Sequence, residues 1–374
     1  MPAPVWPNVS QAGPELTTRL VEAGEPVTEP LVDGVARDFG APVSETTLLD
    51  LPFVTIRRLS ADPSGTGHHG KPPWIIIPPF SGYAPVVTSP LLASALKTGD
   101  VIVTDWVDAR LVPRSMGPFG LRDQVMTLLD TIHLGTKGSV VVALSQSTIA
   151  AIAAFCLNDK AEVEPAALAL LGGPIDARVN AQPLHDFLRF QPLPVIEAQC
   201  LARVPQRFEG TGRRVYPGLF QMLAYAWGSP STYLDAQNGL LAELAGGGPA
   251  ARSREHKDLH SLMDVPAELF LDTVAVAFKQ FGLAEGKLAF DGRRVDLARL
   301  DDRVVLTVEG ERDDLVGPGQ CHALSTIRPQ IRNLSAETIE SARHHDLFTG
   351  ALFLEEVAPL LHGLYDRVTS ELSV

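Results

Sequence analysis

Residues 139 to 150, which read SVVVALSQSTIA, constrain the fold more than any other segment of the chain. An unbroken apolar run, 140–144, is rich in β-branched residues and is typical of a strand buried on both faces of a sheet. The Ala- and Ile-rich stretch after it predicts a helix, and Ser145 lies at the turn between the two. Doubly buried strands occur in parallel sheets that helices cover on both faces, so we predict an α/β fold.

A lone serine between a buried strand and a helix is typical of the nucleophile elbow of α/β-hydrolases. That elbow usually reads G-x-S-x-G, and here the small residues Ala143 and Ser147 occupy the glycine positions. Ser147 is the weaker nucleophile candidate, because its own flanking residue is the bulky Ile149. The alternative interpretation is that Ser145 and Ser147 only cap the following helix.

Composition limits the classes of function that need to be considered. The chain has 374 residues, 45% of them hydrophobic and 20% charged, which is typical of a globular protein. Its net charge of −13 disfavours binding to nucleic acid and to anionic membrane surfaces. The N-terminal residues do not resemble a signal peptide, and no apolar run is long enough to span a membrane. Three widely spaced cysteines suit a reducing compartment, so we expect a cytoplasmic protein.

The rest of the chain alternates short apolar strands with helices, as a mostly parallel sheet with helices on both faces requires. Predicted strands cover residues 53–58, 74–77, 100–104, 139–144, 166–171 and 304–308, and predicted helices cover 15–38, 119–133 and 350–371. Between 178 and 298 the sequence predicts several helical stretches and no clear strand. We therefore expect residues 1–177 and 299–374 to form an α/β-hydrolase core, with 178–298 inserted as a helical cap.

Aromatic and apolar residues are dense in one part of this cap, and most of them are expected to form its own core. Some could instead form an apolar wall for an acyl chain. The candidates for substrate contact are Tyr216, Phe220, Tyr225 and Trp227 in the cap and Trp106 at the end of a core strand.

A serine hydroxyl needs a base, and the base needs an acid that orients it. In α/β-hydrolases the acid and then the histidine follow the serine in the chain. Asp313 or Asp314 follows the late strand 304–308, with Glu309 and Glu311 as weaker rivals. The adjacent His344 and His345 precede the last helix, and either could be the base.

The tetrahedral intermediate of ester hydrolysis needs two backbone N–H donors. The residue after the nucleophile, Gln146, is expected to supply one of them. The loop after strand 74–77 is expected to supply the other, with Tyr83 favoured, Gly82 next and Ser81 as a further candidate.

Metal and cofactor binding find little support in the sequence. His256 and His260 have the spacing of metal ligands on a helix, but Lys257 replaces the glutamate of the H-E-x-x-H pattern and no third ligand follows. We expect neither a metal nor a cofactor.

Several segments in order resemble one family, the intracellular poly(3-hydroxybutyrate) (PHB) depolymerases. The similar segments, from about residue 50 to 365, are PFSGYA at 79–84, TDWVDAR at 104–110, GGPID at 172–176, YPG at 216–218 and VEGERDD at 308–314. The resemblance implies Asp313 as the acid and His344 as the base. The elbow departs from the family, whose nucleophile is usually cysteine, and Ser145 stands in that place.

Together these features predict a serine ester hydrolase with Ser145, His344 and Asp313 as its triad. The resemblance implies PHB or 3-hydroxybutyrate oligomers as substrate, with a granule surface as a possible partner. One alternative is a general carboxylesterase or a hydrolase of another polyester. A further alternative is a non-catalytic relative that binds polymer granules. The sequence does not indicate an oligomeric state.

Overall fold

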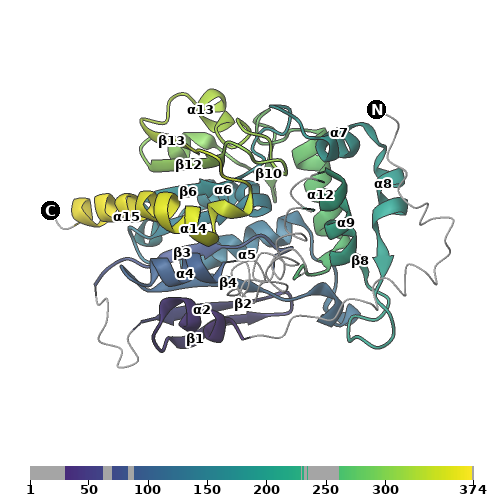
Figure 1. Ribbon diagram of the computed structural model, residues 1–374, viewed down its shortest axis with the longest axis horizontal. Helices are drawn as coiled ribbons and strands as arrows, with labels where there is room; N and C mark the ends of the chain where they lie inside the picture. Colours follow the sequence, from purple (N-terminus) through teal and green to yellow (C-terminus); the bar gives the residue numbers. More distant parts are fainter. Residues whose placement is uncertain are drawn as a thin grey trace.

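One large sheet forms the centre of the protein, which we describe from a computed structural model covering residues 30–61, 70–82, 88–228, 230, 234 and 261–372 (Figure 1). The sheet has eight strands in the order β1-β2-β4-β3-β5-β6-β12-β13. Their bounds are β1 Ser44–Leu51, β2 Val54–Ser60, β3 Trp74–Ile77, β4 Val101–Trp106, β5 Val140–Leu144, β6 Ala167–Leu171, β12 Val304–Gly310 and β13 Asn333–Ile339.

Strand β2 runs antiparallel to both β1 and β4, and the other neighbouring pairs are parallel. This order with one reversed strand near the edge is that of the α/β-hydrolase fold, so the predicted fold class is confirmed. From β3 the chain crosses to β4 on one side and then returns to β5 on the other side. Such a switch point brings the loops after β3 and β5 together, and ligands bind there in open α/β sheets.

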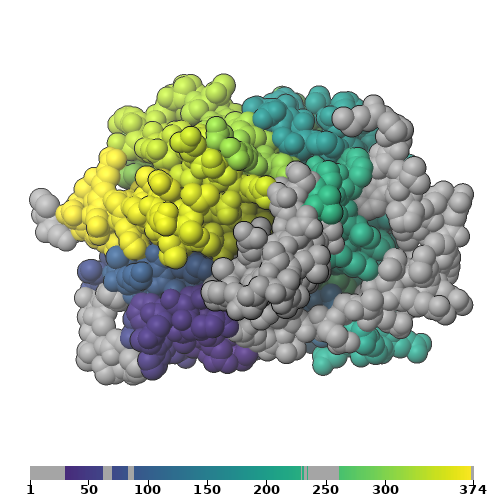
Figure 2. All heavy atoms as spheres, in the orientation of Figure 1, coloured from purple at the N-terminus to yellow at the C-terminus, as the bar shows by residue number. Residues whose placement is uncertain are grey.

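Helices cover both faces of the sheet because the side chains of the strands alternate between two apolar clusters. Ile75 and Ile77 pack in the cluster of α5 (Leu121–His133) and α6 (Thr148–Leu157). Trp74 and Ile76 point the other way, toward α2 (Leu31–Phe39), α4 (Ser89–Ala95) and α15 (Ala358–Leu372). Figure 2 shows this second face, with the yellow C-terminal helices beside the blue and purple N-terminal elements.

The C-terminal helical run, His345–Glu371, is long and apolar enough to cross a membrane by length and composition alone. It includes α14 (Gly350–Leu352), a π-helical turn at Phe353–Val357, and α15. Its Tyr365 ring stacks on Trp74 at 4.6 Å, and the Tyr365 hydroxyl donates to the Pro72 carbonyl at 2.8 Å. The run therefore packs on the sheet as a core helix.

The inserted segment gathers at one end of the sheet, on the right in Figure 1. Its helices are α7 Pro183–Phe190, α8 Leu193–Cys200, α9 Gly218–Gly228 and α12 Ala267–Thr273, followed by a π-helical turn at Val274–Lys279. The prediction that this segment has no strand was wrong, because β7 (Ala202–Arg203), β8 (Arg214–Tyr216) and β9 (Val265–Pro266) form a small antiparallel sheet. A hairpin of β10 (Ala289–Phe290) and β11 (Arg293–Arg294) follows. These strands have two or three residues each, too few for an apolar period to show.

Two further strands, β1 and β13, escaped prediction for a different reason. Both lie at the edges of the large sheet, and most of their residues are partly or fully exposed, so neither has an apolar run. The predicted helix at 15–38 is present as α2 where the chain is described, and its residues 15–29 lie outside the described residues.

Two buried arginines tie the insertion to the core. Arg213, just before β8, donates to the carbonyls of Val112, Pro113 and Gly117, and its guanidinium lies over the Phe53 ring. Arg110 lies between two buried carboxylates, with Nε 2.9 Å from Asp108 and Nη2 3.0 Å from Asp264. Burial, together with the charge of the neighbouring Asp264, raises the pKa of Asp108. The Asp264 carboxylate also accepts from the Gly218 amide, which fixes the start of α9.

Substitution of Arg110 tests how much this ion network stabilises the fold. Arg110→Met removes the cation that both buried carboxylates share, so we expect the free energy of unfolding to fall by about 3–5 kcal/mol. Arg122→Met is the matched control, since the Arg122 pair with Asp291 is exposed and its loss should change stability far less. Urea denaturation of both variants measures the difference, and equal losses would contradict the prediction.

Candidate active site

Ser145 occupies a strained turn directly after β5. Its φ is +49°, in the left-handed region that non-glycine residues rarely adopt. The residues 145–147 form one turn of 3-10 helix before α6 begins at Thr148. Such strain at the C-terminal end of a buried strand is expected of a nucleophile elbow, which presents its side chain clear of the helix.

Hydrogen bonds from Ser147 and Thr148 and a glycine at position 173 stabilise this turn. The buried Ser147 hydroxyl donates to the Pro78 carbonyl at 2.8 Å, and the Thr148 hydroxyl donates to the Ser145 carbonyl at 2.8 Å. A Cβ at Gly173 would come within 2.4 Å of Thr148 Oγ1, so only glycine fits there. Neither Ser145 nor Ser147 makes a side-chain cap on its helix, so the capping alternative is wrong.

His344 reaches Ser145 from the loop after β13. Its Nε2 lies 2.9 Å from Ser145 Oγ, a hydrogen-bond distance. Gly172, with φ +57°, leaves room for the ring, since a Cβ at that position would lie 3.1 Å from His344 Cε1. The imidazole is almost fully buried, which fixes its orientation.

Asp313, after β12, holds the other side of this imidazole. Its Oδ2 lies 2.7 Å from His344 Nδ1, and its Oδ1 accepts from the backbone amides of Leu315 and Val316. The rival carboxylates are engaged elsewhere. Glu309 accepts from the amides of residues 319, 321 and 322, and Glu311 accepts from the amide of residue 341.

The three side chains form one hydrogen-bonded line from carboxylate to imidazole to hydroxyl. Asp313 fixes the tautomer in which His344 Nδ1 carries the proton, which leaves Nε2 free to accept the Ser145 proton. A hydroxyl placed in this way can act as a nucleophile toward a carbonyl carbon.

His345 and Asp314, the secondary candidates for base and acid, do not take part in this hydrogen-bonded line. His345 borders the same cavity, where its ring meets Tyr225 and Phe348 edge-on. Burial lowers the pKa of His345 to about 3, so the ring is neutral at ordinary pH. Asp314 does not line the cavity.

The loop after β3 lies at the edge of the site. Ser81 and Gly82 line the cavity, but the Gly82 amide donates to the Pro79 carbonyl at 3.2 Å, so it is committed within its own turn. The prediction that Gly82 offers its N–H to an oxyanion is therefore wrong. Tyr83, the favoured donor, lies outside the described residues, and Gln146 lines the cavity beside Ser145.

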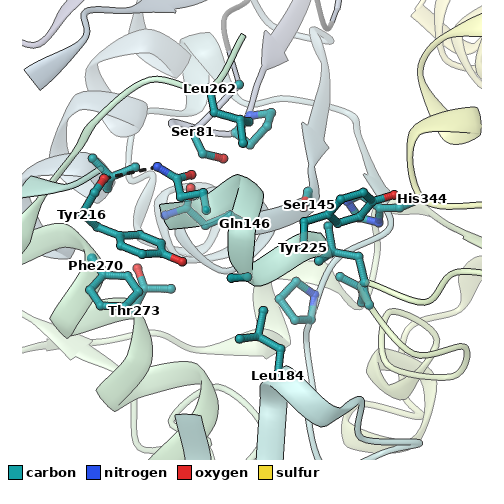
Figure 3. A pocket seen from close by; sticks show the side chains of 18 of the residues that line it. Ser81, Ser145, Gln146, Leu184, Tyr216, Tyr225, Leu262, Phe270, Thr273 and His344 are labelled. Atoms are coloured by element: carbon teal, nitrogen blue, oxygen red, sulfur yellow. Dashed lines mark hydrogen bonds between the residues drawn. The ribbon is translucent and has the colours of Figure 1, made fainter. Parts of the chain in front are cut away.

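A cavity of about 230 Å³ opens over Ser145, between the sheet edge and the insertion (Figure 3). Its walls are mainly apolar and come from both parts of the chain: Leu184 and Leu188 of α7, Tyr216 of β8, Ala224 and Tyr225 of α9, Phe270 of α12, and Leu315, Val316 and Phe348 of the core. The predicted cap residues Tyr216 and Tyr225 are among them.

Three other predicted substrate contacts do not line the cavity. Trp106 turns inward, where its Nε1 donates to the Pro78 carbonyl and its ring packs on Phe80. Phe220 and Trp227 lie on α9 but do not line the cavity, whereas Gln221, Ala224 and Tyr225 of the same helix do. Phe220 is buried without lining the cavity.

His185 is a buried wall residue that the sequence reasoning missed. Its Nδ1 accepts from the Gln320 side-chain amide at 3.1 Å and from the Gln182 amide at 3.4 Å. Burial lowers the pKa of His185 to about 4, against the opposing effects of the Asp313 charge and a hydrogen bond to the Leu315 carbonyl. No sequence motif marks His185, which lies on α7 of the insertion. Only the fold brings it beside the loop that carries Asp313. The predicted metal-ligand pair, His256 and His260, lies outside the described residues.

Residues 172–369 match the family model described as PHB de-polymerase C-terminus. The match covers more than half of the 374 residues. The chain belongs to the PHB depolymerase family. Membership in this family and the α/β-hydrolase fold identify it as a carboxylic ester hydrolase. No curated protein matches the sequence.

Among solved structures, a bacterial membrane phospholipase A shares 16% identity, with 94% of this chain and 92% of that chain covered and a TM-score of 0.48. The haloalkane dehalogenase DatA from Agrobacterium tumefaciens C58 shares 15%, with 88% and 99% covered and a TM-score of 0.49. A carboxylesterase of the thaumarchaeon Nitrososphaera gargenis shares 14%, with 85% and 96% covered and a TM-score of 0.49. The fold assignment rests on the strand order and the family match.

Substitution at Gly172 tests whether the space beside His344 matters for hydrolysis. Gly172→Ala adds a Cβ that meets both His344 and Leu347 at a left-handed backbone position. We expect kcat to fall about tenfold to hundredfold, because a small displacement of the base misaligns proton transfer. Gly363→Ala, where the Cβ meets open space, is the control and should hydrolyse esters at the wild-type rate. Ester hydrolysis assays measure both, and an active Gly172→Ala enzyme would contradict the prediction.

The low pKa of His185 predicts a pH dependence of stability. Between pH 6.5 and about 4 the unfolded chain binds a proton at this histidine and the folded protein does not, so stability falls as the pH falls. His185→Gln should remove this part of the dependence. From pH 7 to pH 5, wild type should lose up to about 2 kcal/mol more than the variant. Urea denaturation at the two pH values measures this difference, and parallel losses would refute it.

Proposed function

We propose that this ester hydrolase uses Ser145 as nucleophile, His344 as general base and acid, and Asp313 as the group that orients the imidazole. The observation that carries the proposal is the unbroken hydrogen-bonded line, 2.9 Å from Ser145 to His344 and 2.7 Å from His344 to Asp313. Ser145 lines the cavity, so a bound ester lies beside it.

In the first half of the reaction, Ser145 Oγ attacks the ester carbonyl carbon while His344 Nε2 takes the hydroxyl proton. The tetrahedral intermediate then collapses, and the leaving alcohol receives that proton from His344. In the second half, water gives a proton to His344 and attacks the acyl group on Ser145. The second tetrahedral intermediate then collapses, His344 returns the proton to Ser145 Oγ, and the carboxylic acid is released.

The negative oxygen of the tetrahedral intermediate needs donors on the side away from His344. We assign one of them to the backbone amide of Gln146, which follows the strained turn and lines the cavity. The second donor is expected from the loop after β3, with Tyr83 as the predicted residue.

We propose poly(3-hydroxybutyrate) or its oligomers as the substrate, on the basis of the family match. The apolar walls around Ser145 suit the methyl and methylene groups of such a chain. A general carboxylesterase or a hydrolase of another polyester is the second candidate, because the line of Ser145, His344 and Asp313 beside an apolar cavity suits other esters as well.

Removal of the nucleophile tests the proposed mechanism. Ser145→Ala should lower kcat for p-nitrophenyl butyrate at least about a thousandfold, because no other group can form the acyl intermediate. A fluorophosphonate probe should label wild type and fail to label this variant. Ser147→Ala is the matched control, since that buried hydroxyl only binds the Pro78 carbonyl. Full activity of Ser145→Ala would exclude the mechanism.

Comparison of rates separates the two candidate substrates. Release of 3-hydroxybutyrate from amorphous polymer and from short oligomers, measured beside hydrolysis of simple esters, gives the order of preference. Faster hydrolysis of oligomers or polymer supports the depolymerase proposal, and activity confined to simple esters supports the carboxylesterase.

A further inference from the structure

The cavity has a polar end that the proposed mechanism does not use. In Figure 3, Tyr216 and Thr273 lie on one side of the cavity, Ser145 and His344 lie on the other, and Gln146 extends between them. All five residues line the same cavity, so a single bound molecule can contact both ends.

Polar atoms at this end have hydrogen-bonding capacity to spare. Thr273 Oγ1 and Gln146 Oε1 are buried, and neither has a hydrogen-bond partner among the described residues. A threonine in a helix commonly donates to the carbonyl one turn earlier, and Thr273 does not. Buried polar atoms are nearly always paired in proteins, and the two residues that carry these oxygens line the cavity, so we take a bound ligand as their missing partner.

Tyr216 adds a hydroxyl on a rigid wall. Its ring stacks on Phe270 at 4.1 Å, and β8 holds its backbone against β9. The Gln221 side chain donates to the carbonyls of Tyr216 and Met263, which fixes the strand further. Burial raises the pKa of the Tyr216 phenol well above its usual value, so the hydroxyl remains a donor.

The charge of the lining limits what this end can bind. No Asp, Glu, Lys or Arg is among the described residues that line the cavity. A carboxylate or ammonium buried there without a partner would be strongly disfavoured. A hydroxyl or an ester carbonyl carries no charge and matches donors and acceptors of the kind that Thr, Tyr and Gln provide.

We infer that Thr273, Tyr216 and Gln146 form a second binding site, which recognises an uncharged oxygen group of the substrate, a hydroxyl or an ester carbonyl away from the bond that is cleaved. This inference rests on the proposed function, because it takes Ser145 as the point of attack. The site makes the enzyme selective for esters whose chain carries a second oxygen over plain alkanoyl esters.

Two esters that differ by one hydroxyl test the site. The ratio of kcat/KM for p-nitrophenyl 3-hydroxybutyrate to that for p-nitrophenyl butyrate measures the selectivity with the leaving group held constant. Thr273→Val removes the hydroxyl and keeps the shape of the side chain, and Tyr216→Phe does the same for the phenol on the same side of the cavity. Each should lower the ratio about threefold to tenfold, the effect of one lost neutral hydrogen bond.

Thr273→Ser is the matched control, because it keeps the hydroxyl and loses only a methyl group. It should retain the wild-type ratio. If Thr273→Ser lowers the ratio as much as Thr273→Val does, packing accounts for the selectivity and the site is overturned. Ratios that remain at the wild-type value in both Thr273→Val and Tyr216→Phe also overturn it, while the proposed function stands. Failure of wild type to hydrolyse either ester would instead overturn the proposed function, and the second site with it.

Discussion

The left-handed backbone at Ser145 is the constraint on which the rest of the site depends. A non-glycine residue in this region costs on the order of 1 kcal/mol, so the surrounding structure must hold it. The buried β5 and the Ala-rich α6 fix the chain on both sides, and the Thr148 hydroxyl binds the Ser145 carbonyl. Gly173 is confined to glycine because Thr148 takes the space that its Cβ would need. The support of the strained serine by Thr148 thereby confines position 173, in the loop after β6, to glycine.

The insertion contributes as much to the cavity as the core does, so its attachment matters to the chemistry. Arg213 binds three carbonyls of the core loop after β4, and Arg110 of that loop pairs with Asp264 of the insertion. Arg213 belongs to the insertion and binds the core, whereas Arg110 belongs to the core and binds the insertion. Tyr216 lies three residues after Arg213, and Gly218, bonded to Asp264, begins α9. The walls that face Ser145 are thus held in register with it by buried charge and backbone contacts.

The core and the line of three side chains were predictable because their signals are local. Ser145 follows a doubly buried strand, Asp313 follows a late strand and His344 precedes the last helix, which is the chain order of an α/β-hydrolase. The choice of His344 over His345 came from the family resemblance alone, because residue pattern does not distinguish two adjacent histidines that differ only in direction. The cavity wall was predicted in part, since Tyr216 and Tyr225 line it while Phe220 and Trp227 do not. His185 and Thr273 were missed because their roles depend on contacts between segments far apart in the sequence.

As the proposed nucleophile, Ser145 requires more from its base than would the cysteine that the family resemblance implies at this position. A cysteine can form a thiolate beside an imidazolium before substrate binds, whereas a serine hydroxyl loses its proton only during attack. The imidazole must therefore already be aligned and must be stabilised as it gains charge. Asp313 meets this demand through a carboxylate fixed by two amides and aimed at Nδ1 of His344. The hydrogen bond from Nε2 to Ser145 then points along the path of the proton, so the architecture around residue 145 suits a hydroxyl.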